Sequence, residues 1–331
     1  MAIISPMVDI QEGSHGIDCA ADCIRGGGVA VLPTETVYGL FGRTSDASAI
    51  AHIYALKGRP NNNPLIAHVL DQASAKTLAA EWPKSADALC DAFWPGPLTI
   101  VVPRHPSVLS QAVGGFNSIA IRSPQHPITR AVLAVVGEPL SGPSANRSGN
   151  VSPTRAAHVK HDYRDVNEAK NLIVLDGGPC ETGLESTVID LTGDYPAIVR
   201  AGSVSHQALE GVLGIGIQNT MPVNQIASPG TRTRHYATHT PLELIEQVDL
   251  PTQLSTQAAV CVIGPAGLTV QHPHQHLEFP SIPKEAARVL YDLLRQADAT
   301  DSTRILIVCP PNTTPWQPIN DRLARASAPH E

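Results

Sequence analysis

The chain has 331 residues, of which 42% are hydrophobic and 16% charged, so we expect a folded globular protein of two domains. Its formal charge of −7 and aromatic content of 4% argue against non-specific polyanion binding and against a base-stacking surface for single-stranded nucleic acid. Its 6 cysteines include no C-x-x-C pair, which fits neither a zinc site nor a disulfide framework. Without a signal-like N-terminus or an apolar run approaching about 18 residues, the sequence predicts a soluble, cytoplasmic protein.

The N-terminal part of the chain predicts a helix and a buried strand that leads into a polar segment. Ile17 to Arg25 has helical spacing and stops at three consecutive glycines. Val29–Leu32 is a short apolar run typical of a buried strand, and Pro33–Leu40 follows it. Because α/β folds place their sites in loops at strand ends, this polar segment is a candidate site.

A second helix is expected after Asp46, which is placed to cap it, and this helix ends near Lys57. Lys57 and Arg59 then open a loop with three asparagines between Pro60 and Pro64. The prolines bar a regular helix there, and the two cations suit a phosphate or a carboxylate. The alternative interpretation of this loop is a solvated turn with ordinary surface charges.

Further strands and helices continue to about residue 215. The predicted strands are Leu65–Leu70, Leu98–Val102, Ser118–Arg122, Leu172–Asp176, Ser186–Leu191 and Ala197–Arg200. Helices are expected over residues 73–81, 86–93 and 128–136 and after Ser205. Pro139–Asn146 is predicted to be a loop, and Ser152 is predicted to cap a helix that starts at Pro153. Because helices and strands mix without strict alternation, we expect a twisted, mixed α/β sheet in a domain of residues 1–215.

The last third of the chain predicts a connector and a second domain. Residues 216–240 form the expected linker, which includes a basic, polar stretch from Ser228 to Tyr236. From residue 241 onward strands alternate with helices, which favours a small open α/β domain over residues 241–331. Its predicted elements are strands Leu242–Ile245, Ala258–Ile263 and Arg304–Val308 and helices Pro283–Ala297 and Ile319–Ala326.

Each polar candidate allows a structural and a functional interpretation. Glu35 is either a general base or a backbone-bonding carboxylate, and His68 is either a core histidine or a ligand contact. Arg122 lies on a strand of otherwise small and apolar residues, so its charge needs an anionic partner from the protein or from a ligand. Ser144 and Asn146 could bond their own turn. The same ambiguity holds for Thr36, Ser186 and Arg200. The sequence contains no G-x-S-x-G, no phosphate-binding G-x-x-x-x-G-K-[ST] and no H-E-x-x-H signature.

Five motifs in order resemble the YrdC-like family. These motifs are Pro33–Leu40, Lys57–Arg59 with Asn63–Leu65, Trp94–Thr99, Pro143–Asn146 and Glu185–Thr187. The tail from Ser228 to Tyr236 resembles the long, two-domain form of that family. The resemblance implies a twisted sheet with a large concave cavity, followed by a small Rossmann-like domain. It also implies the joining of L-threonine, bicarbonate and ATP into threonylcarbamoyl-adenylate, which a separate transferase uses to modify adenosine 37 of tRNA.

The resemblance further implies three sets of site residues. The threonine pocket would be Thr36, His68, Arg122, Gly142 and Ser186. The ATP contacts would be Arg59, Asn63, Ser118, Ser144, Ser152, Arg200 and Tyr236. The catalytic tetrad would be Lys57, Arg59, Ser144 and Asn146. Mg²⁺ would accompany the polyphosphate, held largely by phosphate and water. The stretch from Ser228 to Tyr236 would fold over the cavity as a lid, with Tyr236 touching the nucleotide.

The sequence leaves two alternative functions open. One is an RNA-binding module of the same fold, which the net charge and the few aromatic residues disfavour. The other is a carbamoyltransferase that uses carbamoyl phosphate, although the sequence shows no zinc-finger or acylphosphatase-like segment typical of such relatives. The chain also departs from the commonest family pattern at Thr231, Arg232 and Thr238, close to the His235–Tyr236 pair.

Overall fold

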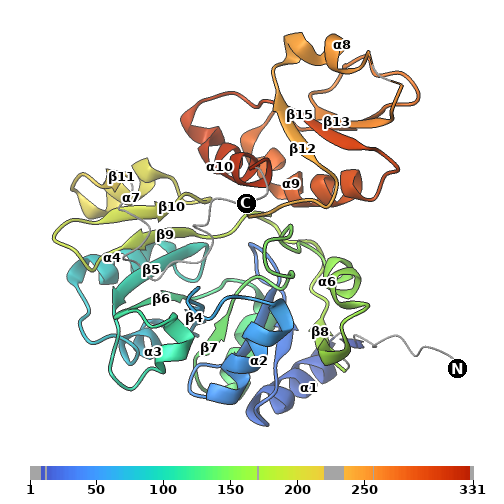
Figure 1. Ribbon diagram of the computed structural model, residues 1–331. Coiled ribbons are helices and arrows are strands. Elements are labelled where there is room, and N and C mark those ends of the chain that lie inside the picture. The colour runs from blue at the N-terminus through green and yellow to red at the C-terminus, as the bar shows by residue number, and fades with distance from the viewer. Residues whose placement is uncertain (1–8, 12, 170, 220–234, 256, 329–331) are drawn as a thin grey trace, which may run out of the picture. The chain divides into compact units, whose positions relative to one another are not determined.

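The computed structural model describes residues 9–11, 13–169, 171–219, 235–255 and 257–328 (Figure 1). The chain divides into two compact units. The large unit comprises Met1–Ser148, Pro153–Glu181 and Glu185–Thr231. The small unit comprises Gly149–Ser152, Thr182–Leu184 and Arg232–Glu331.

The described part of the large unit contains one eleven-stranded sheet in the order β1-β8-β2-β3-β7-β4-β6-β5-β9-β10-β11. The strands are β1 (Asp9–Gln11), β2 (Ala30–Leu32), β3 (Gly39–Arg43), β4 (Ile66–His68), β5 (Leu98–Pro103), β6 (Ser118–Arg122), β7 (Leu140–Gly142), β8 (Ile173–Leu175), β9 (Thr187–Asp190), β10 (Ala197–Arg200) and β11 (Gln218–Asn219). Parallel and antiparallel pairs alternate irregularly, so the sheet is mixed, as predicted.

The helices of the large unit are α1 (Gly13–Arg25), α2 (Ala47–Lys57), α3 (Gln72–Lys76), α4 (Lys84–Phe93), α5 (Pro127–Val136), α6 (Ala156–Tyr163) and α7 (His206–Leu213). In α2, the Asp46 side chain accepts from the backbone N–H groups of Ser48 and Ala49, which confirms its predicted capping role. Gly58 ends the helix at a φ of 60°, in the left-handed region that glycine adopts without strain. The helix therefore ends at a fixed point, with Lys57 in its last turn.

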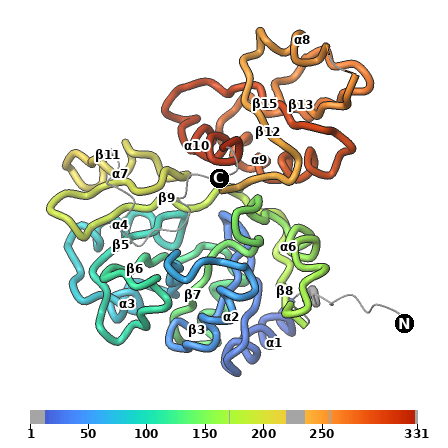
Figure 2. Tube along the Cα trace, in the orientation of Figure 1, coloured from blue at the N-terminus to red at the C-terminus, as the bar shows by residue number. Residues whose placement is uncertain are grey.

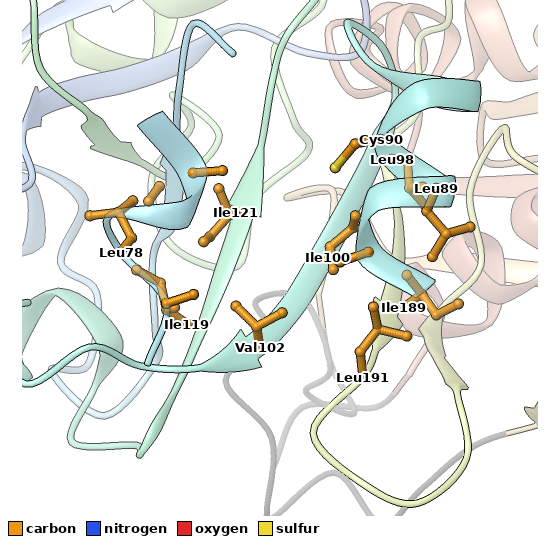
Figure 3. Packing of buried hydrophobic residues seen from close by; sticks show 14 of the residues in the cluster. Leu78, Leu89, Cys90, Leu98, Ile100, Val102, Ile119, Ile121, Ile189 and Leu191 are labelled. Atoms are coloured by element: carbon orange, nitrogen blue, oxygen red, sulfur yellow. The ribbon is translucent and has the colours of Figure 1, made fainter. Parts of the chain in front are cut away.

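Alternation along the central strands places different side chains on the two faces of the sheet. Leu98, Ile100 and Val102 of β5 are buried in one apolar cluster with Leu89 and Cys90 of α4 (Figure 3). Successive strand residues point to opposite faces, so the intervening Thr99 and Val101 lie on the other face. The same alternation in β6 puts Ser118, Ala120 and Arg122 on that second face. The second face is mixed: Val101 and Ala120 belong to a smaller buried apolar cluster, and Thr99 and Arg122 are buried polar positions beside it.

Strand β7 corrects the prediction of a loop over Pro139–Asn146. Leu140–Gly142 forms a strand between β3 and β4, with Ser141 opposite both Gly42 and Ala67. In Figure 2 the green segment β7 lies beside the blue segment β3. The strand is only three residues long, its Ser and Gly have low strand propensity, and it stands between two prolines, so its sequence carries a turn signal.

The helix predicted to start at Pro153 is also placed differently. Helix α6 begins at Ala156, with Arg155 and not Ser152 at the N-cap position. The carbonyl oxygen of Pro153 accepts a hydrogen bond from the Tyr38 backbone N–H at 2.8 Å, and that of Thr154 accepts one from Cys180 at 3.0 Å. These two bonds hold the segment before α6 in an irregular conformation.

The small unit has a four-stranded parallel sheet in the order β12-β15-β13-β14 within the described residues. Its elements are β12 (Leu242–Ile245), α8 (Leu250–Gln253), β13 (Val260–Gly264), β14 (Gln275–Glu278), α9 (Pro283–Asp298), β15 (Arg304–Val308) and α10 (Gln317–Ala326). The open α/β character is confirmed. Strand β14 escaped prediction because it is a short, half-exposed edge strand without an apolar run.

Two short segments from earlier in the chain pack within the small unit. The backbone N–H of Ala237 donates to the Gly149 carbonyl at 2.9 Å, and Arg295 donates to the Val151 carbonyl at 2.5 Å. Among the described residues, none of the helices has both the length and the apolar character of a membrane span.

Candidate active site

Sheet register brings together two of the polar candidates. In the parallel pair β4–β6, His68 lies opposite Arg122, and in the antiparallel pair β4–β7, Ile66 lies opposite Gly142. His68 and Arg122 are therefore neighbours on one face of the sheet. Gly142 lies on the same face, opposite Ile66, which is two residues before His68 in β4. That face is the second, mixed face described above, so the fold itself collects these residues from three strands.

The Arg122 guanidinium donates to three acceptors, one from each of its nitrogen atoms. Nε donates to the Gly96 carbonyl at 3.2 Å, Nη1 to Thr36 Oγ1 at 2.9 Å, and Nη2 to Glu35 Oε1 at 2.7 Å. The side chains of Arg122 and Glu35 are 4% and 5% exposed. The sequence left the anionic partner of Arg122 open between protein and ligand, and here the protein carboxylate of Glu35 supplies it.

Glu35 is itself anchored at both oxygens. Its Oε1 pairs with Arg122, and its Oε2 accepts the backbone N–H of Gln125 at 3.1 Å. Beside it, the hydroxyl groups of Thr34 and Thr36 are hydrogen-bonded to each other, with their oxygen atoms 2.8 Å apart. Of its two sequence interpretations, these contacts fit a carboxylate that holds its surroundings in place.

His68 is a buried, neutral imidazole. Its Nδ1 lies 3.1 Å from the Ile66 carbonyl, and the ring also interacts with the Leu140 backbone. Burial lowers the pKa of His68 to about 3, and the Arg122 charge acts in the same direction. The ring also meets Phe41 edge-on, with the two centroids 4.8 Å apart. A side chain at Gly142 would clash with that same Phe41 ring, so glycine there leaves room for the aromatic contact.

Lys57, Ser144 and Asn146 form a second cluster at the end of α2. Lys57 Nζ donates to the carbonyl of Ser144 at 2.6 Å and to that of Asn146. The Ser144 hydroxyl donates to Asn146 Oδ1 at 2.5 Å. Burial, reinforced by the charges of Arg59 and Arg147, lowers the pKa of Lys57 well below its ordinary value. The sequence motif therefore corresponds to a real constellation in space.

Arg59 and Asn63 are bonded to each other within the loop that follows α2. Arg59 donates from Nε to the Asn63 carbonyl at 3.0 Å and from Nη2 to Asn63 Oδ1 at 2.5 Å. Its Nη2 also reaches the Pro64 carbonyl at 2.8 Å. Both residues are buried, at 7% exposure each, which excludes ordinary surface side chains at these two positions, whereas Asn61 and Asn62 between them are exposed.

Ser186, Arg200 and Thr99 form the third cluster. The hydroxyls of Thr99 and Ser186 are 2.7 Å apart. Arg200 donates from Nε to the Ser186 carbonyl and from Nη2 to the Ser186 hydroxyl, both at 3.1 Å. Arg200 is therefore a buried residue and not the surface residue that the sequence also allowed.

Three further candidates are Ser118, Ser152 and Tyr236. Ser118 begins β6, on the same face of the strand as Arg122, and is 8% exposed. Ser152 and Tyr236 belong to the small unit. Tyr236 has a φ of 63° and stacks on Tyr291 with ring centroids 5.4 Å apart. Most of the predicted lid, residues 228–234, lies outside the described residues.

Sequence reasoning missed Thr99 and Phe41 as parts of the site. Thr99 is the one hydroxyl within the apolar run of β5, and a single polar residue in a buried strand was the available signal. Phe41 gave no signal, because an aromatic residue in a strand is an ordinary core residue.

The donor set does not resemble a metal cage. Among the described residues, no group of three or more His, Cys, Asp or Glu side chains is placed to hold a metal ion. The clusters instead gather buried cations and hydroxyls, and Glu35, the carboxylate among them, is engaged by Arg122. A metal ion here fits as part of a bound nucleotide, coordinated by its phosphates and water.

Fold and clusters together define a class: an α/β protein that gathers buried Lys and Arg side chains and hydroxyls, the groups that suit an anionic ligand. Residues 22–202 match the profile of the Sua5, YciO and YrdC family, which carries the description "Telomere recombination". Residues 204–328 match the profile described as "Threonylcarbamoyl-AMP synthase, C-terminal domain".

Individual relatives agree with these profiles. The Bacillus subtilis threonylcarbamoyl-AMP synthase is 39% identical over 246 residues, which cover 72% of this chain and 69% of the relative. The Pyrococcus abyssi enzyme is 39% identical over 234 residues, covering 70% and 68%. The crystal structure of Pyrococcus abyssi Sua5 complexed with L-threonine superposes with a TM-score of 0.87 at 32% identity, covering 97% of both chains. The chain belongs to the YrdC-like family in its two-domain form, which confirms the resemblance inferred from its motifs.

Proposed function

We propose that this protein joins L-threonine, bicarbonate and ATP into threonylcarbamoyl-AMP with release of pyrophosphate. It is then a nucleotidyltransferase that performs the first step of N6-threonylcarbamoyladenosine formation at tRNA position 37. One observation carries the proposal: the agreement, over 97% of the chain, with a structure complexed with L-threonine. The two profile matches, which together extend from residue 22 to residue 328, support it.

The threonine pocket is proposed around Arg122. A guanidinium binds a carboxylate through two N–H groups in one plane, and Arg122 is already oriented by three protein acceptors. Thr36 accepts a hydrogen bond from Arg122, and His68 lies opposite Arg122 in the sheet, which supports assigning both to the pocket. Gly142 would contribute its backbone, and Ser186 its hydroxyl, which Thr99 and Arg200 hold in position.

The proposed reaction brings two anions together. The carbamate formed from the threonine amine must approach the α-phosphate of ATP, and like charges oppose that approach. Lys57 and Arg59 are buried nitrogen donors fixed by carbonyl acceptors, and a neighbouring anion favours the charged form of Lys57, so both are suited to offset the charge without reorganising. Ser144 and Asn146 complete this tetrad, and no covalent nucleophile is needed.

The nucleotide contacts are proposed as Arg59, Asn63, Ser118, Ser144, Ser152, Arg200 and Tyr236. Mg²⁺ would arrive with ATP and neutralise part of the polyphosphate charge. Residues 1–215 would form the catalytic domain, residues 216–240 the linker and lid, and residues 241–331 the accessory domain. The product would pass to a tRNA threonylcarbamoyl transferase complex, and we expect neither stable nucleic-acid binding nor membrane association by this chain.

The direct test is a coupled assay of pyrophosphate release with ATP, Mg²⁺, bicarbonate and L-threonine. We expect release that depends on threonine and on bicarbonate, and an adenylate product that contains both. Release independent of threonine would contradict the proposal. Activity with carbamoyl phosphate in place of bicarbonate would favour a carbamoyltransferase, and RNA affinity that survives saturating ATP and threonine would favour a binding module.

A further inference from the structure

Glu35 lies directly beside the guanidinium that the proposed function assigns to the threonine carboxylate. Its Oε1 is 2.7 Å from Arg122 Nη2, and its Oε2 accepts the Gln125 backbone N–H at 3.1 Å. The two side chains are 5% and 4% exposed. The Glu35 charge is therefore fixed in place and poorly screened by solvent.

This pair is electrically balanced before any ligand arrives. A buried arginine without a counter-charge would be costly, and Glu35 removes that cost. A carboxylate that binds the same guanidinium then adds a second negative charge. Bound to the same guanidinium as Glu35, that carboxylate would fall within the roughly 4–6 Å over which neighbouring charges strongly perturb each other. A ligand that brings only a carboxylate adds a negative charge that the Glu35–Arg122 pair does not compensate.

We infer that Glu35 makes this site selective for zwitterionic α-amino acids over carboxylic acids that lack an amino group. An α-ammonium group lies next to its own carboxylate, so it supplies the positive charge that the Glu35–Arg122 pair and the ligand carboxylate together require. The inference rests on the proposed function, because that function places the ligand carboxylate on Arg122. It concerns the binding of the amino acid, before its amine loses a proton.

A purely structural role for Glu35 makes a different prediction. If Glu35 served only to orient Arg122, its loss would weaken every carboxylate ligand by a similar factor. If its charge also acts on the ligand, its loss weakens the zwitterion and spares or strengthens the simple anion. The ratio of two affinities therefore separates the roles, whereas a single affinity does not.

The experiment compares L-threonine with (R)-3-hydroxybutyrate, which is L-threonine with its amino group replaced by hydrogen. Both ligands are titrated by calorimetry into the full-length wild-type protein, Glu35→Gln and the matched control Glu138→Gln. Glu138 is a second carboxylate paired with an arginine, Arg43, at 3.4 Å. We expect the wild-type preference for threonine to exceed tenfold. We expect Glu35→Gln to reduce this preference by about tenfold or more, as for a charge contact with poor screening, and Glu138→Gln to leave it unchanged.

The outcomes separate this inference from the proposed function. A wild-type protein that does not bind threonine, with or without ATP, removes both. Threonine binding with the same preference in wild type and Glu35→Gln removes only the inference. If Glu35→Gln does not fold, two further measurements decide. Equal wild-type affinities for the two ligands overturn the inference. Glu35→Asp, which keeps the charge but withdraws it by one methylene, must show an intermediate preference, and an unchanged preference overturns it.

Discussion

Lys57 illustrates what a residue pattern conveys and what it omits. The sequence predicts that Lys57 lies at a helix end, because Asp46 caps the helix and a Gly and a Pro follow it. It does not indicate that Nζ is buried against the carbonyls of Ser144 and Asn146, almost ninety positions away. Those carbonyls come together only because β7 is inserted beside β3, and β7 itself lacked a strand signal. Residue type and local geometry were therefore predictable, and the partners were not.

Lys57→Met should remove a fixed buried cation while keeping the length of the side chain. We expect threonine-dependent pyrophosphate release to fall by about 100-fold or more, which is the scale for losing one preorganised donor. Threonine affinity, measured by calorimetry, should change by far less, because the proposed pocket lies around Arg122. The control is Lys76→Met, since Lys76 is an exposed lysine paired with Asp87. Activity of Lys57→Met within a few fold of wild type would remove Lys57 from the tetrad.

His68 should make the folded protein sensitive to acid. Its folded pKa of about 3 lies below the ordinary value of 6.5, so on acidification the unfolded chain takes up a proton that the native protein does not. The free energy of unfolding should therefore fall as pH decreases from about 6.5 towards 3, by at most about 1.4 kcal/mol per pH unit from this group. Urea unfolding of His68→Gln between pH 6.5 and 4.5 should show a shallower dependence. His52→Gln, which removes an exposed imidazole, is the control, and identical slopes in all three proteins would contradict the assignment.

At the scale of elements, prediction succeeded where one local signal dominated. Strands β6, β10, β12 and β15 match their predicted bounds because each is a short apolar run between turn residues. Prediction failed at β7 and β14, because these strands form by pairing with neighbouring strands and their own side chains give no strand signal. The helix start at Ala156 failed for the same reason, since tertiary hydrogen bonds to Tyr38 and Cys180 override the capping signal of Ser152.

Helix α2 provides a test of how much one cap contributes to the site. Asp46→Ala should destabilise the large unit by about 1 kcal/mol, because two backbone N–H groups lose their acceptor. Asp46 also pairs with Arg43 at 2.8 Å, so Asp46→Asn is the matched variant that keeps the cap and loses the ion pair. We expect Asp46→Asn to retain most of the stability in thermal and urea unfolding. Equal losses in the two variants would assign the effect to the ion pair.

For the whole molecule, the sequence predicted two α/β domains and their order, and the family profiles divide the chain near residue 203. It did not predict that Gly149–Ser152 and Thr182–Leu184 join the small unit. Nothing in the sequence of those seven residues indicates that they belong to the small unit. In the first segment, Gly149 accepts from the Ala237 backbone N–H and Val151 accepts from the Arg295 side chain. Ser152 was therefore recognisable only by family resemblance, as was Tyr236.

Tyr236 tests the proposed lid. Tyr236→Ala should weaken ATP binding and threonine-dependent pyrophosphate release together, by roughly tenfold or more, if its ring stacks on or contacts the nucleotide. Tyr236→Phe keeps the ring that stacks on Tyr291, so it should unfold at nearly the wild-type temperature and isolate the role of the hydroxyl. Nucleotide affinity and activity that are unchanged in both variants would remove Tyr236 from the ATP site.

The edge of the large sheet sets an order of events during synthesis. Strand β1 at residues 9–11 pairs with β8 at residues 173–175, and β2 takes β8 as its second neighbour. Strand β1 can therefore pair only after a strand more than 160 residues later has been synthesised, which at about 5–20 residues per second is a delay of roughly 10–30 s. During that interval β2 presents an unpaired edge, so the nascent chain depends on chaperones or on slow, non-local closure to avoid pairing with other chains.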